Sequence, residues 1–536
     1  MRLILPLLAF LLALPHAQAD DLAPANAEAI RAHVAFLADD LLEGRATGSR
    51  GYDIAAKYVA TQMAIAGLKP AGSDGGWLQP VSLIESMRVV PAAEAIITRG
   101  GMQVPLAPAA EFLPSAGFFG TEAKVEAAMV FVGYGISAPA FGHDDFAGLD
   151  LRGKIAVVLD GSPGTLPSSE RAHHSRETTR EIESRGAVGI VTVQTPARAA
   201  KTPWEKSVLL SALPSRRLLD GDGQPVDAYP GIRARIYVNV AAAAKLFEGG
   251  PKPLEQVWAD AEAGVPQGFD LPASIRIVTR SELSRVASAN VVGLLEGSDP
   301  VLRNEYVVFS AHLDHLGQGD AVHGDSIYNG ALDNASGVAV MLEAARLIAA
   351  GPRPKRSIIF LAVTAEESGL LGSKRFAQDP TVPKDAIVAN VNMDMPVALY
   401  PLAGFTAFGA EHSTLGEVAR RATEAEGLQL VPDRAPDEVL FVRSDQYSFV
   451  REGIPALYLD DARLSSDPSV DPEAVFRDHL RVNYHMPSDD MNLPIHWPSL
   501  AALARINARI GIDVANNPER PSWHPGDFFG ETFGRN

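Results

Sequence analysis

Five side chains of the types that bind metals lie in the second half of the sequence. Two are histidines and three are carboxylates: His312, Asp333, Glu367, Asp394 and His485. Because the chain has no cysteine among its 536 residues, any zinc-like ion must be held by histidine and carboxylate ligands. This set suffices for two divalent ions if one carboxylate bridges them and each ion keeps an open position. It therefore predicts a two-metal site that activates water for hydrolysis.

Three of these ligands follow apolar runs that are typical of buried strands. His312 follows YVVFSA, Glu366 and Glu367 follow SIIFLAVTA, and Asp394 follows IVANVNM. Ligands of open α/β sheets bind at the carboxyl ends of the strands, so we expect these side chains to meet there. Asp333 lies in GALDNASG ahead of a helical pattern, and His485 lies in the turn-rich NYHMPSDD. Taken alone, Asp333 could equally be a helix cap and His485 a polar loop residue.

Two further carboxylates adjoin the predicted ligands. Glu366, next to Glu367, is the natural general base, because it can take a proton from the attacking water and pass it to the leaving amine. Asp314 comes two residues after His312. We expect its carboxylate to accept a hydrogen bond from the second imidazole nitrogen of His312 and to fix the tautomer.

The surrounding elements alternate between strand and helix patterns. Residues 268–515 combine buried apolar strands with amphipathic helices, which predicts an α/β fold with a doubly wound, mostly parallel sheet. Short apolar runs bounded by glycine and proline predict a separate β-rich unit over residues 122–267. We therefore expect residues 20–121 and 268–515 to form the main domain, with 122–267 inserted. Residues 516–536 are expected to be an extended tail.

The first 19 residues have the pattern of a cleaved signal peptide. Arg2 precedes an apolar run that ends at Leu14, and Ala17-Gln18-Ala19 is a small-x-small cleavage site. The run is short for a membrane span, and no cysteine is present for lipidation. We expect an exported protein, periplasmic or secreted, without a membrane anchor. The net charge of -18 argues against a nucleic-acid partner. The sequence does not indicate an oligomeric state.

Five motifs carry a family resemblance. AHLDHLG, YNGALDNASGVA, TAEESGLLGS, NMDM and YHMPSDD resemble, in order and spacing, the two-zinc aminopeptidases related to glutamate carboxypeptidase II and the transferrin receptor. The likeness covers Asn290 to about Asp513, and ADDLLEGRATGSRGYDIAAKYVATQMAIAGLKPAG is similar to the N-terminal helices of secreted members. The segment FVGYGISAPAFGHDDFAGLDLRGKIAVVLDG resembles a protease-associated domain. The resemblance implies that this domain is inserted into the catalytic one.

The resemblance also implies a role for each ligand and for the whole chain. It implies two Zn²⁺ ions per chain, with His312 and Asp394 on one ion, Glu367 and His485 on the other, and Asp333 between them. It makes Glu366 the base and Asp314 the orienting carboxylate. The implied activity is the release of N-terminal amino acids from peptide substrates.

Substrate-binding residues are expected in LFVRSDQYSF. Phe441 stands where some of these aminopeptidases carry a tyrosine that binds the oxyanion, which leaves that task to the metals or to Tyr447. Phe441, Val442 and Phe449 suggest an apolar slot for the first residue of the substrate. Arg443 supports an alternative, because a guanidinium can hold a C-terminal carboxylate bidentately.

The alternatives to an aminopeptidase fall into two classes. On the same fold the chain could be a carboxypeptidase or a one-zinc glutaminyl cyclase. A non-catalytic, receptor-like protein is the other class. Such a protein is expected to have lost ligands or Glu366, and all of these residues are present.

Overall fold

The computed structural model of the chain describes residues 22–265, 267–434, 436 and 439–535. The predicted signal peptide, residues 1–19, lies outside the described residues. In the part of the chain that is described, no helix combines the length and the apolar character needed to cross a membrane.

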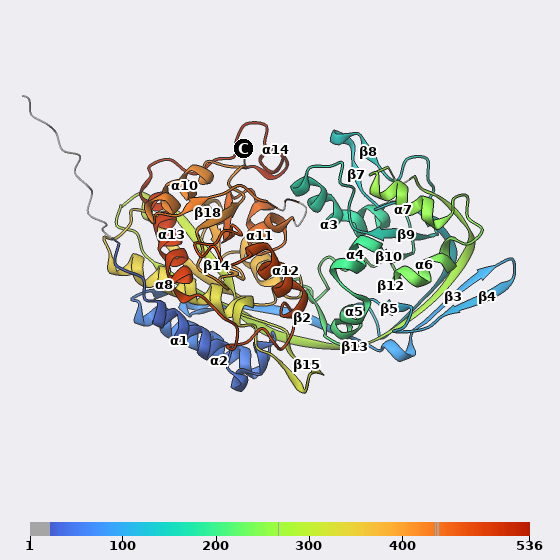
Figure 1. The fold of residues 1–536 in the computed structure, drawn as a ribbon, viewed down its shortest axis with the longest axis horizontal. Coiled ribbons are helices and arrows are strands. Elements are labelled where there is room, and N and C mark those ends of the chain that lie inside the picture. Colours follow the sequence, from blue (N-terminus) through green and yellow to red (C-terminus); the bar gives the residue numbers. More distant parts are fainter. Residues whose placement is uncertain (1–21, 266, 435, 437–438, 536) are drawn as a thin grey trace, which may run out of the picture.

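One strand of 27 residues, β13 (Phe269–Leu295), runs through both lobes of the molecule (Figure 1). Its first half pairs antiparallel with β3 (Glu94–Arg99) and β6 (Glu122–Phe131). Its second half pairs antiparallel with β2 (Leu78–Arg88) and β17 (Ser357–Val363). We call residues 94–280 the inserted lobe and the remaining described residues the main lobe. β13 therefore joins the sheets of the two lobes.

The main lobe is built on a buried, mostly parallel sheet. Its central strands lie in the order β17, β14 (Tyr306–His312), β18 (Ile387–Asn392) and β21 (Ala456–Asp461), and neighbours in this series are parallel. Every residue of β17 and β18 is buried, as expected for strands covered on both faces. The predicted α/β fold with a mostly parallel sheet is confirmed.

Helices cover both faces of this sheet. Five helices share the larger hydrophobic core on one face: α1 (Ala27–Leu37), α2 (Arg50–Ile65), α8 (Gly337–Ala350), α10 (Leu415–Ala425) and α13 (Trp497–Asn516). Two helices pack on the other face: α9 (Leu371–Gln378) and α11 (Gln446–Val450). Alternate residues of β14 divide between the faces, since Phe309 packs in the first core and Val308 in the second.

Short strands complete the main lobe. Its sheet is extended by β1 (Lys69–Pro70), β19 (Gly404–Phe408) and β20 (Gln429–Leu430). A separate hairpin is formed by β15 (Gly317–Val322) and β16 (Asp325–Tyr328).

The inserted lobe has its own sheet and core. Besides β3, β6 and the first half of β13, its strands are β4 (Met102–Leu106), β5 (Phe112–Pro114), β9 (Ile155–Asp160), β10 (Gly189–Gln194) and β12 (Ala234–Val238). Its helices are α3 (Ser168–Ser184), α4 (Pro196–Lys201), α5 (Trp204–Ser211), α6 (Val240–Phe247) and α7 (Leu254–Glu262). The short pair β7 (Ser137–Ala138) and β8 (His143–Asp144) lies beside them.

The bounds of this lobe differ from the expected 122–267. β3, β4 and β5 belong to its sheet although they precede residue 122. Conversely, β11 (Ser215–Leu218) leaves it and pairs antiparallel with β2 of the main lobe. The reason is that an apolar strand pattern shows that a segment is a strand but does not show which strand it pairs with.

The C-terminal segment is packed rather than extended. Residues Phe528–Phe533 form the helix α14, and the Phe529 side chain is fully buried. Phe529 lies against Phe441 and Tyr447, with ring centroids 5.5 Å and 6.3 Å away. The aromatic residues of the segment supply the apolar surface that fixes it to the main lobe.

Candidate metal centre

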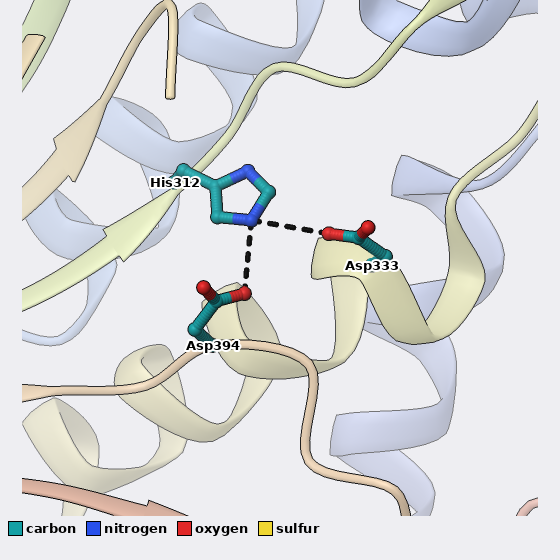
Figure 2. Close-up of side chains that lie close together, drawn as sticks. All are labelled: His312, Asp333 and Asp394. Carbon is teal, nitrogen blue, oxygen red and sulfur yellow. Dashed lines mark hydrogen bonds and ion pairs between the residues drawn. The ribbon is translucent and has the colours of Figure 1, made fainter. Parts of the chain in front are cut away.

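The two carboxylate oxygens of Asp333 face different groups of predicted ligands. His312 Nε2 lies 3.2 Å from Asp333 Oδ1 and 3.0 Å from Asp394 Oδ1. Figure 2 shows the His312 ring between these two carboxylates. On the other side, His485 Nε2 lies 3.2 Å from Asp333 Oδ2 and 3.1 Å from Glu367 Oε2. The five predicted ligands therefore converge, with Asp333 in the middle.

The carboxyl ends of the parallel strands supply three of the five ligands. His312 is the last residue of β14, Glu367 follows β17, and Asp394 follows β18. Since β14 lies between β17 and β18 in the sheet, the three side chains emerge at one edge. The predicted meeting of these side chains is thus observed.

Asp333 reaches the same edge from a tight loop ahead of α8. Gly330 has a φ of +60°, and a Cβ there would lie 2.1 Å from the Asp333 carbonyl oxygen. A Cβ on Gly337 would lie 2.0 Å from Asn334 Oδ1. The peptide bond between Asp333 and Asn334 is cis. The glycines of GALDNASG therefore permit a close backbone approach, as the sequence suggested.

Two residues of the centre were not predicted. His315 Nδ1 lies 2.7 Å from Glu367 Oε1 and 4.0 Å from Asp333 Oδ2. Asp489 accepts hydrogen bonds from the backbone N–H groups of Leu332 (2.9 Å) and Asp333 (3.0 Å). His315 lies in AHLDHLG and Asp489 in YHMPSDD. Both residues were therefore visible in the motifs, but the order of residues does not show where a side chain points.

The charges of the ligands compensate one another. Burial alone would raise the pKa of Asp333, but hydrogen bonds from His312 and His485 hold it well below its usual range. Burial also opposes ionisation of Glu367, yet His485 and His315 lower the pKa of Glu367 to about 2. Burial disfavours the charged form of His485, while Glu367 and Asp333 raise its pKa to about 10. Protonated imidazoles thus balance the carboxylates at neutral pH.

This donor set fits divalent ions of the zinc type. Ligand atoms of His312, Asp333 and Asp394 lie within 4.8 Å of one another, as do those of His312, Glu366 and Glu367. A divalent ion would displace the imidazole protons and supply the same compensating charge. One site would use His312 and Asp394, the other His485 and Glu367, and Asp333 would be shared.

Glu366 has the environment of an acid–base group. Burial raises its pKa well above the usual range, and although His312 opposes this, Asp394 and Asp445 add to the rise. Its backbone N–H donates to Asp314 Oδ1 at 3.1 Å. A raised pKa suits a carboxylate that must accept a proton and then release it.

Asp314 is placed differently from the prediction. His312 Nδ1 lies 3.0 Å from the backbone carbonyl oxygen of Asp314, and not beside its carboxylate. The carboxylate instead accepts from the Glu366 N–H and from the Thr47 hydroxyl, at 3.1 Å and 3.0 Å. The tautomer of His312 is therefore fixed by the backbone, and the Asp314 carboxylate fixes the strand end that carries Glu366.

The three side chains of the predicted apolar slot are all buried in cores. Phe449 is fully buried against Phe376, and Phe441 stacks on His412 with ring centroids 4.8 Å apart. Val442 is also buried. The predicted apolar slot is therefore wrong, because these residues face the sheet and α14.

Tyr447 and Arg443 have different surroundings. The Tyr447 hydroxyl is hydrogen-bonded to His173 Nδ1 of α3 at 2.6 Å, so it is engaged with the inserted lobe. Arg443 is exposed. Tyr484, which was not predicted, precedes His485 and stacks on its ring with a centroid separation of 3.9 Å. Tyr484, and not Tyr447, is therefore the tyrosine that contacts a predicted metal ligand.

Known proteins resemble this chain over parts of its length. Aminopeptidase NAALADL1 of Mus musculus is 34% identical over 139 residues, which cover 25% of this chain and 17% of that protein. A protein named Probable zinc metalloprotease from Pyrenophora teres f. teres is 40% identical over 112 residues, 20% of this chain and 22% of that protein. The chain thus spans about a fifth of the length of these curated relatives.

A solved structure shows the same fold over nearly the whole chain. An aminopeptidase from Aneurinibacillus sp. strain AM-1 is 19% identical, with 94% of this chain and 97% of that chain covered and a TM-score of 0.54. Residues 290–511, which contain all five predicted ligands, match peptidase family M28. The match to this family therefore covers the part of the chain that carries the candidate metal centre.

Proposed function

We propose that the protein is a two-zinc aminopeptidase, which releases N-terminal amino acids from peptides. The observation that carries this proposal is the position of Asp333, with Oδ1 toward His312 and Oδ2 toward His485. A carboxylate that faces two separate ligand pairs in this way is suited to bridge two ions. The names of the two relatives, an aminopeptidase and a probable zinc metalloprotease, support the same activity.

The residues around the centre divide the work of hydrolysis. Bound zinc ions would polarise the scissile carbonyl and lower the pKa of water. Glu366 takes a proton from the attacking water and passes it to the leaving amine. The Asp314 carboxylate holds the Glu366 backbone in place. Tyr484 replaces Tyr447 as the proposed donor to the oxyanion, because it stacks on ligand His485.

A second candidate, a carboxypeptidase, is favoured by two arginines. Arg443 and Arg176 of α3 are both exposed, and their charges are close enough to interact. The same Arg176 side chain is within the electrostatic reach of Glu366. Such a pair can hold a C-terminal carboxylate. The carboxylate-rich centre, in contrast, favours a substrate with a free, cationic amine.

Three substrates separate these activities. The metal-loaded protein should hydrolyse leucine amide and should fail on N-acetyl-leucine amide, because the blocked amine is no longer cationic. An N-blocked dipeptide with a free C-terminus should also remain intact. Cleavage of that dipeptide without turnover of leucine amide would establish the carboxypeptidase instead.

We further propose that the inserted lobe is a protease-associated domain that narrows access to the centre, and that the mature chain is exported. Strands β9, β10 and β12 with α3 form a compact unit beside the main lobe, as expected for such a domain. Sequencing the N-terminus of the exported protein tests the second point. A mature chain that still began at Met1 would contradict it.

A further inference from the structure

A cavity of about 350 Å³ lies where the inserted lobe meets β2 and β11, and arginines dominate its polar lining. Arg88 ends β2, Arg217 lies in β11, and Arg235 lies in β12. Of the described residues that line the cavity, none is acidic. Three positive charges therefore share one cavity without an anion in its wall.

The guanidinium groups of Arg217 and Arg235 keep most of their donors available. Arg217 donates to the carbonyl oxygen of its neighbour Arg216 at 2.7 Å and lies 4.9 Å over the Phe118 ring. Arg235 donates to the Thr179 hydroxyl at 3.1 Å. Among the described residues these are their only hydrogen bonds, whereas each guanidinium has five N–H donors.

Arg88 has a different function in the same wall. It donates to the carbonyl oxygens of Ser211 (2.8 Å), the last residue of α5, and of Leu213 (2.9 Å), just beyond it. Its guanidinium is therefore fixed by the end of that helix. It contributes positive charge to the cavity rather than free donors.

The neighbouring carboxylate is already neutralised. Asp227 lines an adjoining cavity of about 320 Å³, which shares Arg217 and Arg235 with the first. Its carboxylate accepts a hydrogen bond from Lys374 Nζ, and the Arg180 guanidinium lies 3.9 Å from its Oδ1. Burial, with the charges of Arg217 and Arg88 acting in the same direction, lowers the pKa of Arg235 to about 10. The positive charges of these arginines thus repel one another, and a bound anion would offset that repulsion.

We propose that this cavity binds a small oxyanion such as sulfate or phosphate, held by the forks of Arg217 and Arg235, with Arg88 as a third positive charge. The planar guanidinium matches the paired oxygens of such an anion. The hydroxyl groups of Ser115 and Ser207 add polar lining. The volume is sufficient for one anion together with water.

The site is placed to support the metal centre from a distance. Ser207 and Leu210 of α5 line the cavity. On the same helix, Lys206 Nζ donates to the Tyr484 carbonyl oxygen at 2.7 Å, next to ligand His485. A bound anion would therefore hold in place the helix that contacts the loop of His485.

Calorimetric titration of the zinc-loaded protein with sodium sulfate at constant ionic strength tests the proposal. We expect saturable binding of one sulfate per chain, and at least a tenfold weaker affinity in Arg217→Gln and in Arg235→Gln. Arg303→Gln, which changes an exposed arginine outside the cavity, should bind as the unchanged protein does. Arg235→Lys keeps the charge but loses the fork, so it should weaken binding while the fold is retained.

Further titrations separate this site from the metals and define the ligand. Asp333→Ala should retain sulfate binding, because the cavity does not contain the metal ligands. Phosphate should bind in the same cavity, and succinate more weakly if the site prefers a tetrahedral anion. The proposal is overturned if sulfate does not saturate, if the folded arginine variants bind it unchanged, or if Asp333→Ala abolishes binding.

Discussion

Two adjacent glutamates after β17 occupy different surroundings. Glu367 lies between His315 and His485, at 2.7 Å and 3.1 Å, and its pKa is lowered to about 2 although burial opposes this. The pKa of Glu366 is raised instead, first by burial and then by nearby carboxylates. Neighbouring side chains at a strand end point in different directions, which explains how one serves as ligand and the other as base.

The substitutions of these two residues should therefore have different effects. Glu366→Gln should retain both metal ions and lose on the order of 100-fold or more in kcat, the usual scale for removal of a general base. Glu367→Ala should lose one ion or both. Metal analysis of the purified variants, together with kcat on leucine amide, distinguishes the roles. Equal metal content in the two variants would contradict the assignment.

At this scale the sequence predicted which residues meet but not how each side chain is directed. The order of strands and ligand types was enough for His312, Glu367 and Asp394, because strand ends converge by topology. The orientation of Asp314 and the burial of Phe449 depend on packing between segments distant in the sequence. A one-dimensional pattern does not contain that information.

A short turn near the N-terminus positions the loops of the centre. Arg45 ends the 3₁₀ segment Asp40–Arg45, and its buried guanidinium donates to the carbonyl oxygens of Leu313 (3.0 Å) and Gly330 (3.1 Å). It also donates to the carbonyl oxygens of Asn329 and Leu37. Leu313 follows ligand His312, and Gly330 begins the loop of Asp333. One side chain therefore ties two ligand-bearing segments together.

Arg45→Met should weaken both the fold and the metal centre. It leaves several buried carbonyl groups without a donor, and each unpaired group costs about 1–3 kcal/mol, so we expect a loss of at least about 3 kcal/mol in unfolding free energy. Zinc affinity should fall as well, because the loops of His312 and Asp333 are no longer held together.

Denaturant titration and zinc competition assays measure the two effects of Arg45→Met. The matched control is Arg50→Met, which changes an exposed arginine at the start of α2. The control should keep the unfolding free energy and zinc affinity of the unchanged protein. Wild-type values in Arg45→Met would show that the guanidinium does not position the loops.

At the scale of elements, hydrophobic periodicity predicted the alternation of strands and helices in the main lobe. It did not predict that β11 crosses back to pair with β2, or that β3 to β5 join the inserted lobe. It also did not distinguish two strands from the single long β13. Strand pairing is decided by contacts distant in the sequence, which local propensity does not encode.

At the scale of the whole molecule, one contact region connects the inserted lobe, α11 and the C-terminus. His173 of α3 is hydrogen-bonded to the Tyr447 hydroxyl at 2.6 Å. Its ring also packs on Phe528 and Phe533 of α14, with centroids 5.6 Å and 5.4 Å away. Three segments from different parts of the sequence thus meet around one imidazole. The protonation of this histidine should therefore affect how the lobes hold together.

The folded protein disfavours the charged form of His173. Burial lowers its pKa from 6.5 to about 4, and the charges of His174, Arg451 and Arg176 act in the same direction. As the pH falls, the unfolded chain takes up this proton first. His173 therefore leaves stability unchanged above about pH 6.5, reduces it progressively between pH 6.5 and 4, and adds no further change below that range.

His173→Gln should remove this part of the acid sensitivity while an amide keeps a hydrogen bond to Tyr447. At roughly 1.4 kcal/mol per pKa unit, the unchanged protein should lose up to about 3 kcal/mol more than the variant between pH 6.5 and 4. Denaturant unfolding at a series of pH values measures the unfolding free energy of both proteins. The acid-induced loss from all other groups is common to both, so it cancels in the difference between them. His323→Gln, at an exposed position between β15 and β16, should follow the unchanged protein. Parallel stability curves for His173→Gln and the unchanged protein would mean that the histidine at the lobe contact titrates freely.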